Sequence, residues 1–476
     1  MDHEDRQRLE ELFTRRGVLG LGGSAAAAAF LAACGSSSKS AAPTTTAATA
    51  TTTVAATTTA AATTSAPASG GGSNAAKFGG GGKDGKLKIG FTAPLTGPLA
   101  GFGEANDFTL AAMKDLLKDG IQLGGKSYAV DIITRDVQSN SDTAASQAGK
   151  LITDDKVDMM IAIATPEMIN PVADQCEANG IPCLSTLAPW QPYFFGRKGD
   201  PAKGFDWTYH FFWGADQLVK VFGDLWSSVP NNKSVAMLCA NDPDGSALAD
   251  PKTGFPAGID ALGYKLVDGG RFKVGNDDFS AMIGKFKGAD VLVGIPIPPD
   301  FATFWKQAKQ QGFNPKVATL AKAVLFPAAV EALGDTGDGL ASEVWWTPSH
   351  PFKSSLTGVS CKDIGDQYTK SVGKQWTQFI GFVHALFEVA FDSVARAGST
   401  DKQKLVDAIK ATKLDTMVGP ISFGQTGLPK NVCPTPLVGG QWQKSASGPY
   451  KFDLVIVDNK QATNIPTGGT IKPLGA

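Results

Sequence analysis

The chain has 476 residues, a formal net charge of −1 and a charged fraction of 19%, which is below the roughly 25% of ordinary soluble domains. This composition offers no excess of positive charge to a phosphate backbone, so it excludes electrostatic binding of nucleic acid.

The first predicted element is an export signal over residues 1–33. Arg15 and Arg16 precede a weakly apolar stretch, which is the pattern read by the twin-arginine export route. The stretch ends in Leu31-Ala32-Ala33-Cys34, a small-residue site typical of lipoprotein cleavage. A membrane-spanning helix is the alternative, but about 17 residues diluted with Gly and Ala fall short of the roughly 20 that a bilayer core requires. We predict an exported protein, lipidated on Cys34 and anchored to the outer face of the cytoplasmic membrane.

Residues 34–85 consist almost entirely of Ser, Ala, Thr and Gly. Such a segment buries too little apolar surface to offset the entropy of ordering it. We therefore predict a disordered tether that makes no core contacts and holds the globular part away from the membrane.

From Lys86 onward the hydrophobic pattern alternates between strands and helices. Strands are predicted at 87–92, 128–134, 157–164 and 181–185, with helices at 105–118, 143–152 and 169–178. A second series follows the aromatic stretch 207–213, with strands at 234–240, 264–267, 290–296 and 316–320 and a helix at 301–311. This alternation predicts an α/β fold of parallel sheets covered by helices. The roughly 390 residues after the tether are too many for one core, so we expect two Rossmann-like lobes.

Catalytic signals are sparse in this chain. Beyond the signal peptide the histidines are His210, His350 and His384, and neither zinc-ligand spacing nor a G-x-S-x-G elbow is found. We expect a protein that is not an enzyme and needs no metal or other cofactor.

Five cysteines follow Cys34 in the sequence. Cys176 and Cys183 flank a predicted helix-to-strand turn, which is close enough for a disulfide in an oxidising compartment. Cys361 and Cys433 are the other expected pair, and Cys239 is left as a buried thiol. The alternative is that all five are reduced and packed.

Three segments carry a resemblance to a known family: IGFTAPLTGPLAGFGEA from Ile89, PPDFATFWKQAKQQGF from Pro298, and LDTMVGPISFG from Leu414 followed by LVGGQW. They resemble the lipid-anchored, Leu/Ile/Val-type solute-binding proteins of ABC importers, which have the type I periplasmic-binding fold. The resemblance implies a ligand cleft between two lobes that close on a hinge. It also implies a first lobe of 86–208 plus 344–437 and a second of 209–343 plus 438–476.

The resemblance assigns ligand contacts residue by residue. It implies an aromatic contact at Phe102, a polar turn at Thr165 and Glu167, and a loop from Ser185 that would hold a ligand carboxylate. Asp244 stands in place of a family Tyr. The ligand-binding residues expected are Phe102, Thr165, Glu167, Ser185, Thr186, Trp190, Trp213, Asp244, Ile297 and Lys322.

Lys322 departs from the family pattern, because the acidic residue that pairs with a substrate ammonium falls on this lysine. A lysine there would repel an α-ammonium group. One alternative is a ligand whose anion faces Lys322 and whose apolar body lies against Phe102, Trp190 and Trp213. The other is a lysine directed into solvent. Glu167 or Asp244 could instead supply the partner of a ligand ammonium, which keeps amino acids among the expected ligands.

We therefore expect a monomeric solute-binding lipoprotein that captures a small organic ligand, such as an amino acid or a related carboxylate, and delivers it to the membrane permease of an ABC importer. A ligand-sensing receptor ectodomain of the same fold is the alternative function. An α/β hydrolase or transferase is a more remote one.

Overall fold

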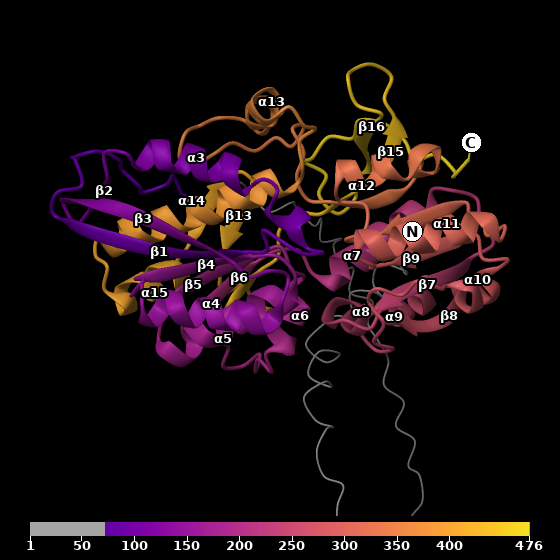
Figure 1. Cartoon of the computed structure of the whole chain (residues 1–476), viewed down its shortest axis with the longest axis horizontal. Helices are drawn as coiled ribbons and strands as arrows, with labels where there is room; N and C mark the ends of the chain where they lie inside the picture. Colours follow the sequence, from indigo (N-terminus) through magenta and orange to yellow (C-terminus); the bar gives the residue numbers. More distant parts are fainter. Residues whose placement is uncertain (1–71, 476) are drawn as a thin grey trace, which may run out of the picture.

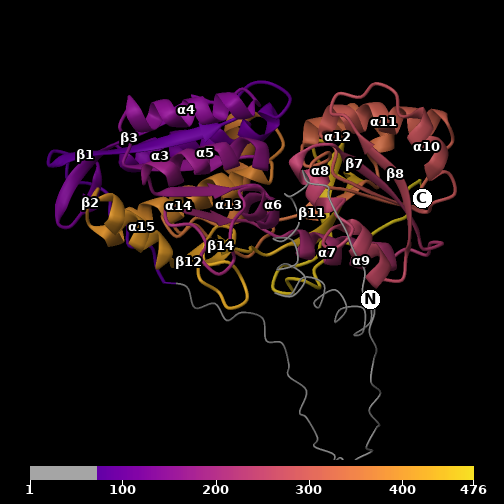
Figure 2. The ribbon, with the colours of Figure 1, turned by 90° about the horizontal axis from the view of Figure 1, so that it is seen from below.

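The structure is a computed structural model, and it describes residues 72–475. The predicted signal peptide, Cys34 and most of the predicted tether lie outside the described residues. Figures 1 and 2 show two lobes side by side, each with a central sheet covered by helices. The predicted fold class is therefore confirmed.

The sheet of lobe 1 has seven strands in the described part of the chain, in the order β14-β6-β5-β4-β1-β3-β2. Its pairs are parallel except for the antiparallel pair β2–β3. The strands are β1 (Gly85–Ala93), β2 (Ile121–Leu123), β3 (Lys126–Asp136), β4 (Met159–Ile163), β5 (Cys183–Thr186), β6 (Thr208–Phe211) and β14 (Val432–Cys433). The accompanying elements are η2 (Ala100–Gly103), α3 (Asn106–Leu117), α4 (Ser141–Thr153), α5 (Pro166–Asn179), α6 (Trp190–Gly196), α13 (Cys361–Val372), α14 (Phe379–Ala397), α15 (Lys402–Lys410) and the ribbon of β12 (Lys413–Thr416) and β13 (Gly419–Ser422).

Lobe 2 contains a second sheet, in the order β16-β15-β11-β10-β9-β7-β8. Its strands are β7 (Ser234–Ala240), β8 (Lys265–Phe272), β9 (Val291–Gly294), β10 (Val317–Leu320), β11 (Ala341–Val344), β15 (Val438–Lys444) and β16 (Phe452–Asp458). Its helices are α7 (Ala215–Ser227), α8 (Pro243–Leu248), α9 (Phe255–Ala261), α10 (Ser280–Phe286), α11 (Pro298–Gln310), α12 (Pro327–Ala332) and η3 (Gly334–Gly337).

The chain passes between the two sheets after β6, after β11 and after β14. Strand β6 continues in the first sheet to Phe211, three residues beyond the end of the first segment of lobe 1 at 208 that the family resemblance implies. The third crossing lies between Cys433 and Val438. These connecting segments bring Phe212, Trp213 and Trp345 to the junction of the lobes.

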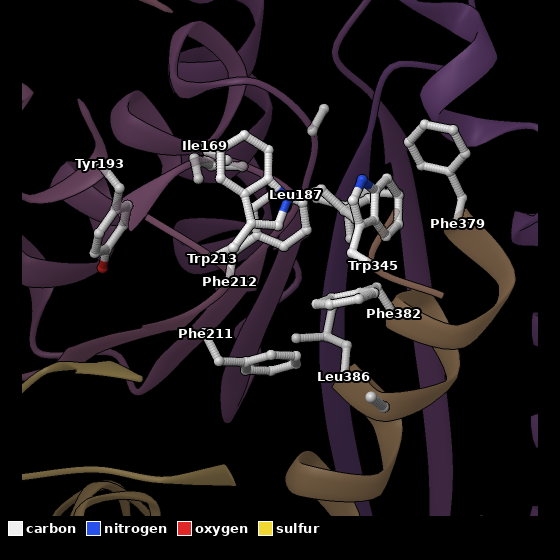
Figure 3. Packing of buried hydrophobic residues seen from close by; sticks show 14 of the residues in the cluster. Ile169, Leu187, Tyr193, Phe211, Phe212, Trp213, Trp345, Phe379, Phe382 and Leu386 are labelled. Carbon is white, nitrogen blue, oxygen red and sulfur yellow. The ribbon is translucent and has the colours of Figure 1, made fainter. Parts of the chain in front are cut away.

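The core of lobe 1 is built around α14. This helix buries every residue from Phe379 to Val394, so the protein encloses it on all sides, and the polar side chains of His384, Glu388 and Asp392 are buried with the apolar ones. Figure 3 shows part of this packing, in which Phe382 lies near Phe211 and Trp345.

The prediction of a tether without core contacts through residue 85 is wrong for residues 72–85. The Phe78 ring packs edge-on against Phe391 at 6.0 Å, and the Gly72 amide donates to the Lys413 carbonyl at 3.0 Å. The Ala75 amide donates to Asp392 Oδ1 at 2.9 Å. An apolar ring and a series of hydrogen bonds therefore hold this segment against lobe 1.

Both predicted disulfides are absent, because the five cysteines that the structure describes are all free and buried. Cys361 Sγ lies 3.2 Å from Met417 Sδ, and Cys433 Sγ accepts from the Ser422 amide at 3.3 Å, so these two thiols have different partners. Burial raises the pKa of Cys176 well above its usual value, and the neighbouring Cys183 thiol raises it further. The alternative of reduced, packed thiols is what the structure contains.

None of the helices between residues 72 and 475 is long and apolar enough to cross a membrane.

Candidate functional site

A small cavity lies where the two lobes meet. Its volume is about 20 Å³, which is room for roughly one water molecule. Helix α8 of lobe 2 contacts α5 and α6 of lobe 1 beside it, so the lobes are closed together here. The lining residues are Phe102, Thr165, Leu187, Pro189, Phe212, Trp213, Asp244, Ile295, Lys322, Leu325, Glu343 and Trp345.

These residues lie at the carboxyl ends of parallel strands from both sheets. Phe102 follows β1, Thr165 follows β4 and Asp244 follows β7. Ligands of open α/β sheets bind at this edge, so this interlobe cavity, which we call the cleft site, is the candidate.

A larger hollow of about 550 Å³ lies on lobe 1 alone, between α3, β3 and Gly81. Its lysines, Lys114 and Lys118, are exposed. The cleft site is smaller, but residues of both lobes line it and several of its polar groups are buried, which is the arrangement of a site that closes around a ligand.

Lys322 is the central charge of the cleft site. Its Nζ atom lies 2.9 Å from Asp244 Oδ2 and 3.0 Å from Asp242 Oδ2. Burial would lower the pKa of Lys322, but the charges of Asp244, Asp242 and Glu167 outweigh burial and raise the pKa above its usual value. The Lys322 backbone has a φ of +65°, a left-handed conformation that costs about 1–3 kcal/mol for a residue other than glycine.

This geometry overturns one expectation for Lys322 and changes the other. The solvent-directed alternative is wrong, because the side chain is only 4% exposed. The alternative in which Lys322 binds a ligand anion is limited by Asp242 and Asp244, because both already bind the Lys322 ammonium group. The Lys322 charge is therefore compensated within the protein by Asp242 and Asp244, and no uncompensated positive charge is left at this position to bind a ligand anion.

Acidic groups outnumber Lys322 around the cleft site. Asp244 is 3% exposed. Burial raises its pKa to about 7 against the effect of Lys322, and Glu167 and Asp242 add to the rise. Burial also raises the pKa of Glu343 to about 8, while its Oε2 accepts from Ser342 Oγ at 2.8 Å. The charges of Asp242, Asp244 and Glu167 act on Lys322, and Glu343 is a further carboxyl group in the same lining. The raised pKa values of Asp244 and Glu343 favour their neutral forms and so reduce the excess of negative charge.

Aromatic rings close the apolar side of the cleft site. Phe102 of lobe 1 meets Phe326 of lobe 2 edge-on at 5.5 Å, so an aromatic contact spans the two lobes. The Phe212 ring lies 4.9 Å from Trp213 and 5.3 Å from Trp345, and Figure 3 shows these three rings gathered beside Leu187. In this closed arrangement the rings fill the space between the lobes, and the remaining cavity of about 20 Å³ does not hold a ligand body. The lobes would have to part before these rings could form an apolar wall for a ligand.

Several buried polar atoms of the lining have no hydrogen-bond partner among the described residues. They include the Thr165 hydroxyl, the Trp213 and Trp345 indole nitrogens, and Asp244 Oδ1. Glu167 Oε2, next to the lining, is also unpartnered. Such atoms are costly to bury and are normally satisfied. The cleft site therefore contains both unused donors and unused acceptors.

The structure brings together part of the expected residue set. Phe102, Thr165, Trp213, Asp244 and Lys322 line the cleft site, and the charge of Glu167 acts on Asp244 and Lys322.

The other expected residues do not line the cleft site. Ser185 Oγ lies 2.9 Å from His210 Nδ1, and Thr186 Oγ1 donates to the Phe211 carbonyl at 2.6 Å. Trp190 packs against Phe195 at 5.9 Å, and Ile297 precedes α11 while Ile295 lines the site.

Sequence reasoning missed Asp242, Glu343, Phe212 and Trp345. Asp242 could have been found, because it lies two residues from Asp244 and its side chain accepts from the Gly245 amide at 2.6 Å as the N-cap of α8. Glu343 lies in β11, a strand that the hydrophobic pattern did not indicate.

The three histidines that the structure describes are buried with lowered pKa values. Burial lowers the pKa of His210 and His350 to about 3 and that of His384 to about 4. Their rings bond to Ser185, Thr347 and Ser354, so they act as structural hydrogen-bonding groups. Among residues 72–475 no group of His, Cys, Asp and Glu is arranged to hold a metal ion.

A family model described as periplasmic binding protein matches residues 86–444. The Leu/Ile/Val-binding protein homolog 3 of Brucella melitensis is 24% identical over 352 residues, which cover 72% of this chain and 88% of that protein. The branched-chain amino acid transporter substrate binding protein LivJ of Streptococcus pneumoniae, solved with isoleucine, has 16% identity and a TM-score of 0.63, covering 78% and 99% of the two chains. A solute binding protein of an ABC transporter from Rhodopseudomonas palustris BisB5, solved with 3,4-dihydroxy benzoic acid, has 20% identity and a TM-score of 0.62, covering 79% and 99%.

Proposed function

Because this chain belongs to the periplasmic binding protein family, we propose that it captures a small organic solute between its lobes and delivers it to the permease of an ABC importer. One observation carries the proposal: residues of both lobes line the cleft site, and α8 closes against α5 and α6 beside it. A solute held there is released when the lobes part, as a delivery protein requires.

The lining supports a ligand with an apolar body and polar ends. Phe102, Trp213 and Trp345 supply apolar surface, while unpartnered atoms of Thr165 and Asp244 supply hydrogen-bonding capacity. Two similar structures were solved with isoleucine and with 3,4-dihydroxy benzoic acid. Both compounds are small carboxylic acids with an apolar portion, and we propose the same general class here.

In this proposal the protein binds and releases its solute unchanged and catalyses no reaction. The family is that of the periplasmic binding proteins, and the described histidines of this chain are buried groups that hydrogen-bond to Ser185, Thr347 and Ser354. We place the protein outside the cytoplasm, as the family implies, and assign its membrane attachment to acyl chains on Cys34.

A thermal-shift screen tests the proposal. The panel contains amino acids, aromatic acids, small amides and polyols. A ligand that binds only the folded state at 100 times its dissociation constant stabilises that state by about 2.7 kcal/mol. We expect at least one compound to raise the melting temperature by several degrees, and a panel without any such compound would count against solute capture.

A further inference from the structure

We propose that His210, a buried residue of lobe 1, is a positioning residue of the cleft site: it holds the loop after β5 in the conformation in which Leu187 and Pro189 line that site. The inference rests on the proposed solute-binding function, because it names a residue on which the shape of the solute site depends. His210 is not one of the lining residues, so it would affect a solute only through this loop.

The first observation is that the His210 ring bonds to the chain on both sides of Leu187. Its Nδ1 atom lies 2.9 Å from Ser185 Oγ, and its Nε2 atom lies 2.8 Å from the Ala188 carbonyl oxygen. A carbonyl oxygen only accepts hydrogen bonds, so Nε2 carries the proton. Burial lowers the pKa of His210 to about 3, although the bond to Ala188 opposes this change. The ring is therefore neutral near pH 7, and its Nδ1 atom accepts from the Ser185 hydroxyl.

The second observation is that lobe 1 fixes the His210 ring itself. The side chain is fully buried, and the His210 amide in β6 donates to the Asn431 carbonyl at 2.9 Å. The imidazole stacks on the Tyr193 ring with the two centroids 4.2 Å apart. Arg197 Nη1 in turn donates to the Tyr193 hydroxyl at 2.8 Å. His210 therefore offers its two nitrogens to the loop from a fixed place.

The third observation is that the loop is strained where it meets the cleft site. Leu187 has a φ of +78°, a left-handed conformation that residues with a Cβ atom rarely adopt. Such a conformation persists only where the surrounding contacts impose it, and it is concentrated at ligand sites. The Leu187 side chain is buried and lines the cleft site. Loss of the bond to Ala188 would leave the loop free to relax and would move Leu187.

The loop also leads into the helix on which the lobes close. Pro189 is the N-cap of α6, and α6 contacts α8 of lobe 2. The Trp190 amide donates to the carbonyl of Trp213, a lining residue, at 3.1 Å. A displacement of Ala188 would therefore change both the wall of the cleft site and the contact between the lobes.

Three variants of the full chain test this role. His210→Phe keeps an aromatic ring to stack on Tyr193 and removes both hydrogen bonds. His210→Gln keeps a side-chain N–H donor for the Ala188 carbonyl, so it is the conservative rescue. His384→Phe is the matched control, because His384 is also a buried histidine of lobe 1 that bonds to a serine, Ser354, and it does not line the cleft site.

Two measurements on the ligand-free protein test the inference without any solute. In hydrogen exchange, we expect residues 187–195 to exchange about tenfold faster in His210→Phe and at the wild-type rate in His210→Gln and His384→Phe. Nitrogen-15 NMR of the wild-type protein should place the His210 proton on Nε2. Exchange of residues 187–195 that is equal in His210→Phe and His384→Phe, or a proton on Nδ1, would overturn the inference. The NMR result decides even where His210→Phe does not fold.

Calorimetry then measures the effect on binding, with L-isoleucine and 3,4-dihydroxy benzoic acid as the probes. For a probe that binds the wild type, we expect the dissociation constant to rise about tenfold in His210→Phe and to change by less than about twofold in His210→Gln and His384→Phe. An unchanged constant in His210→Phe would overturn the inference and leave solute capture supported. Failure of both probes to bind the wild type would count against the proposed solute class, and the exchange and NMR results would then decide the role of His210.

Discussion

The Nζ atom of Lys322 lies 2.9 Å from Asp244 Oδ2, and both side chains are almost completely buried at the junction of the lobes. The pair joins the loop after β10 to the start of α8 within lobe 2. The ion pair therefore fixes the position of the Asp244 carboxylate in the absence of a ligand. Removing the Lys322 charge should lower the free energy of unfolding and should also weaken ligand binding.

Lys322→Met should lower the free energy of unfolding by about 3–5 kcal/mol, because it leaves Asp242 and Asp244 as uncompensated buried charges. Chemical denaturation measures the loss. The double variant Lys322→Met/Asp244→Asn should recover part of it, since one of the two stranded charges is then gone. A double variant less stable than the single one would contradict this description of the pair.

Glu343 should make stability depend on pH. Its pKa is raised from 4.5 to about 8 in the folded state by burial, so the folded state holds the proton more tightly than the unfolded state. The resulting stability is fully present below pH 4.5 and is lost as pH rises through about 8. Glu343→Gln keeps the shape of the protonated acid, so it should gain stability relative to the wild type as pH rises across this range. The free energy of unfolding of both proteins is measured by chemical denaturation at several pH values. A difference between the two that stays constant from pH 5 to 8 would argue against a protonated Glu343.

Phe78→Ala should destabilise the protein by about 1–3 kcal/mol, because the ring packs against Phe391 in lobe 1. Leu95→Ala is the control, since Leu95 is 41% exposed and its loss should matter little. The melting temperatures of the two variants and of the wild type, measured by thermal unfolding, test this prediction. Equal melting temperatures would mean that residues 72–84 add nothing to lobe 1.

Cys34→Ala should release the protein from the membrane fraction without changing its melting temperature. Cys34 lies outside the described residues, and the prediction depends on the small-residue site that ends at this cysteine. Fractionation followed by immunodetection makes the measurement. A variant that still sediments with membranes would place the anchor elsewhere.

Much of the fold follows from hydrophobic periodicity. The predicted strand 234–240 coincides with β7, and the predicted helix 301–311 falls within one residue of the end of α11. Strand β11 was missed because its four residues include Ser342 and Glu343, which interrupt the apolar run that marks a buried strand.

The location of the site was predictable, but the orientation of its side chains was not. Parallel sheets place their ligands at strand ends, and Phe102 and Thr165, which follow strands β1 and β4, line the candidate cleft site. Ser185 and Thr186 instead belong to β5, so their hydroxyls bond within the sheet. The partners of Lys322 are 78 and 80 residues away in sequence, and no local pattern reveals such a pairing.

Hydrogen-exchange mass spectrometry with the most stabilising compound of the screen tests solute capture between the lobes most directly. We predict slower exchange both at the start of α5 in lobe 1, around Thr165 to Asn170, and in α8 of lobe 2, around Asp242 to Leu248. Residues 129–133 of β3, which line the hollow on lobe 1, should exchange at an unchanged rate. Protection confined to one lobe, or found at residues 129–133 in place of α5 and α8, would contradict a binding site between the lobes.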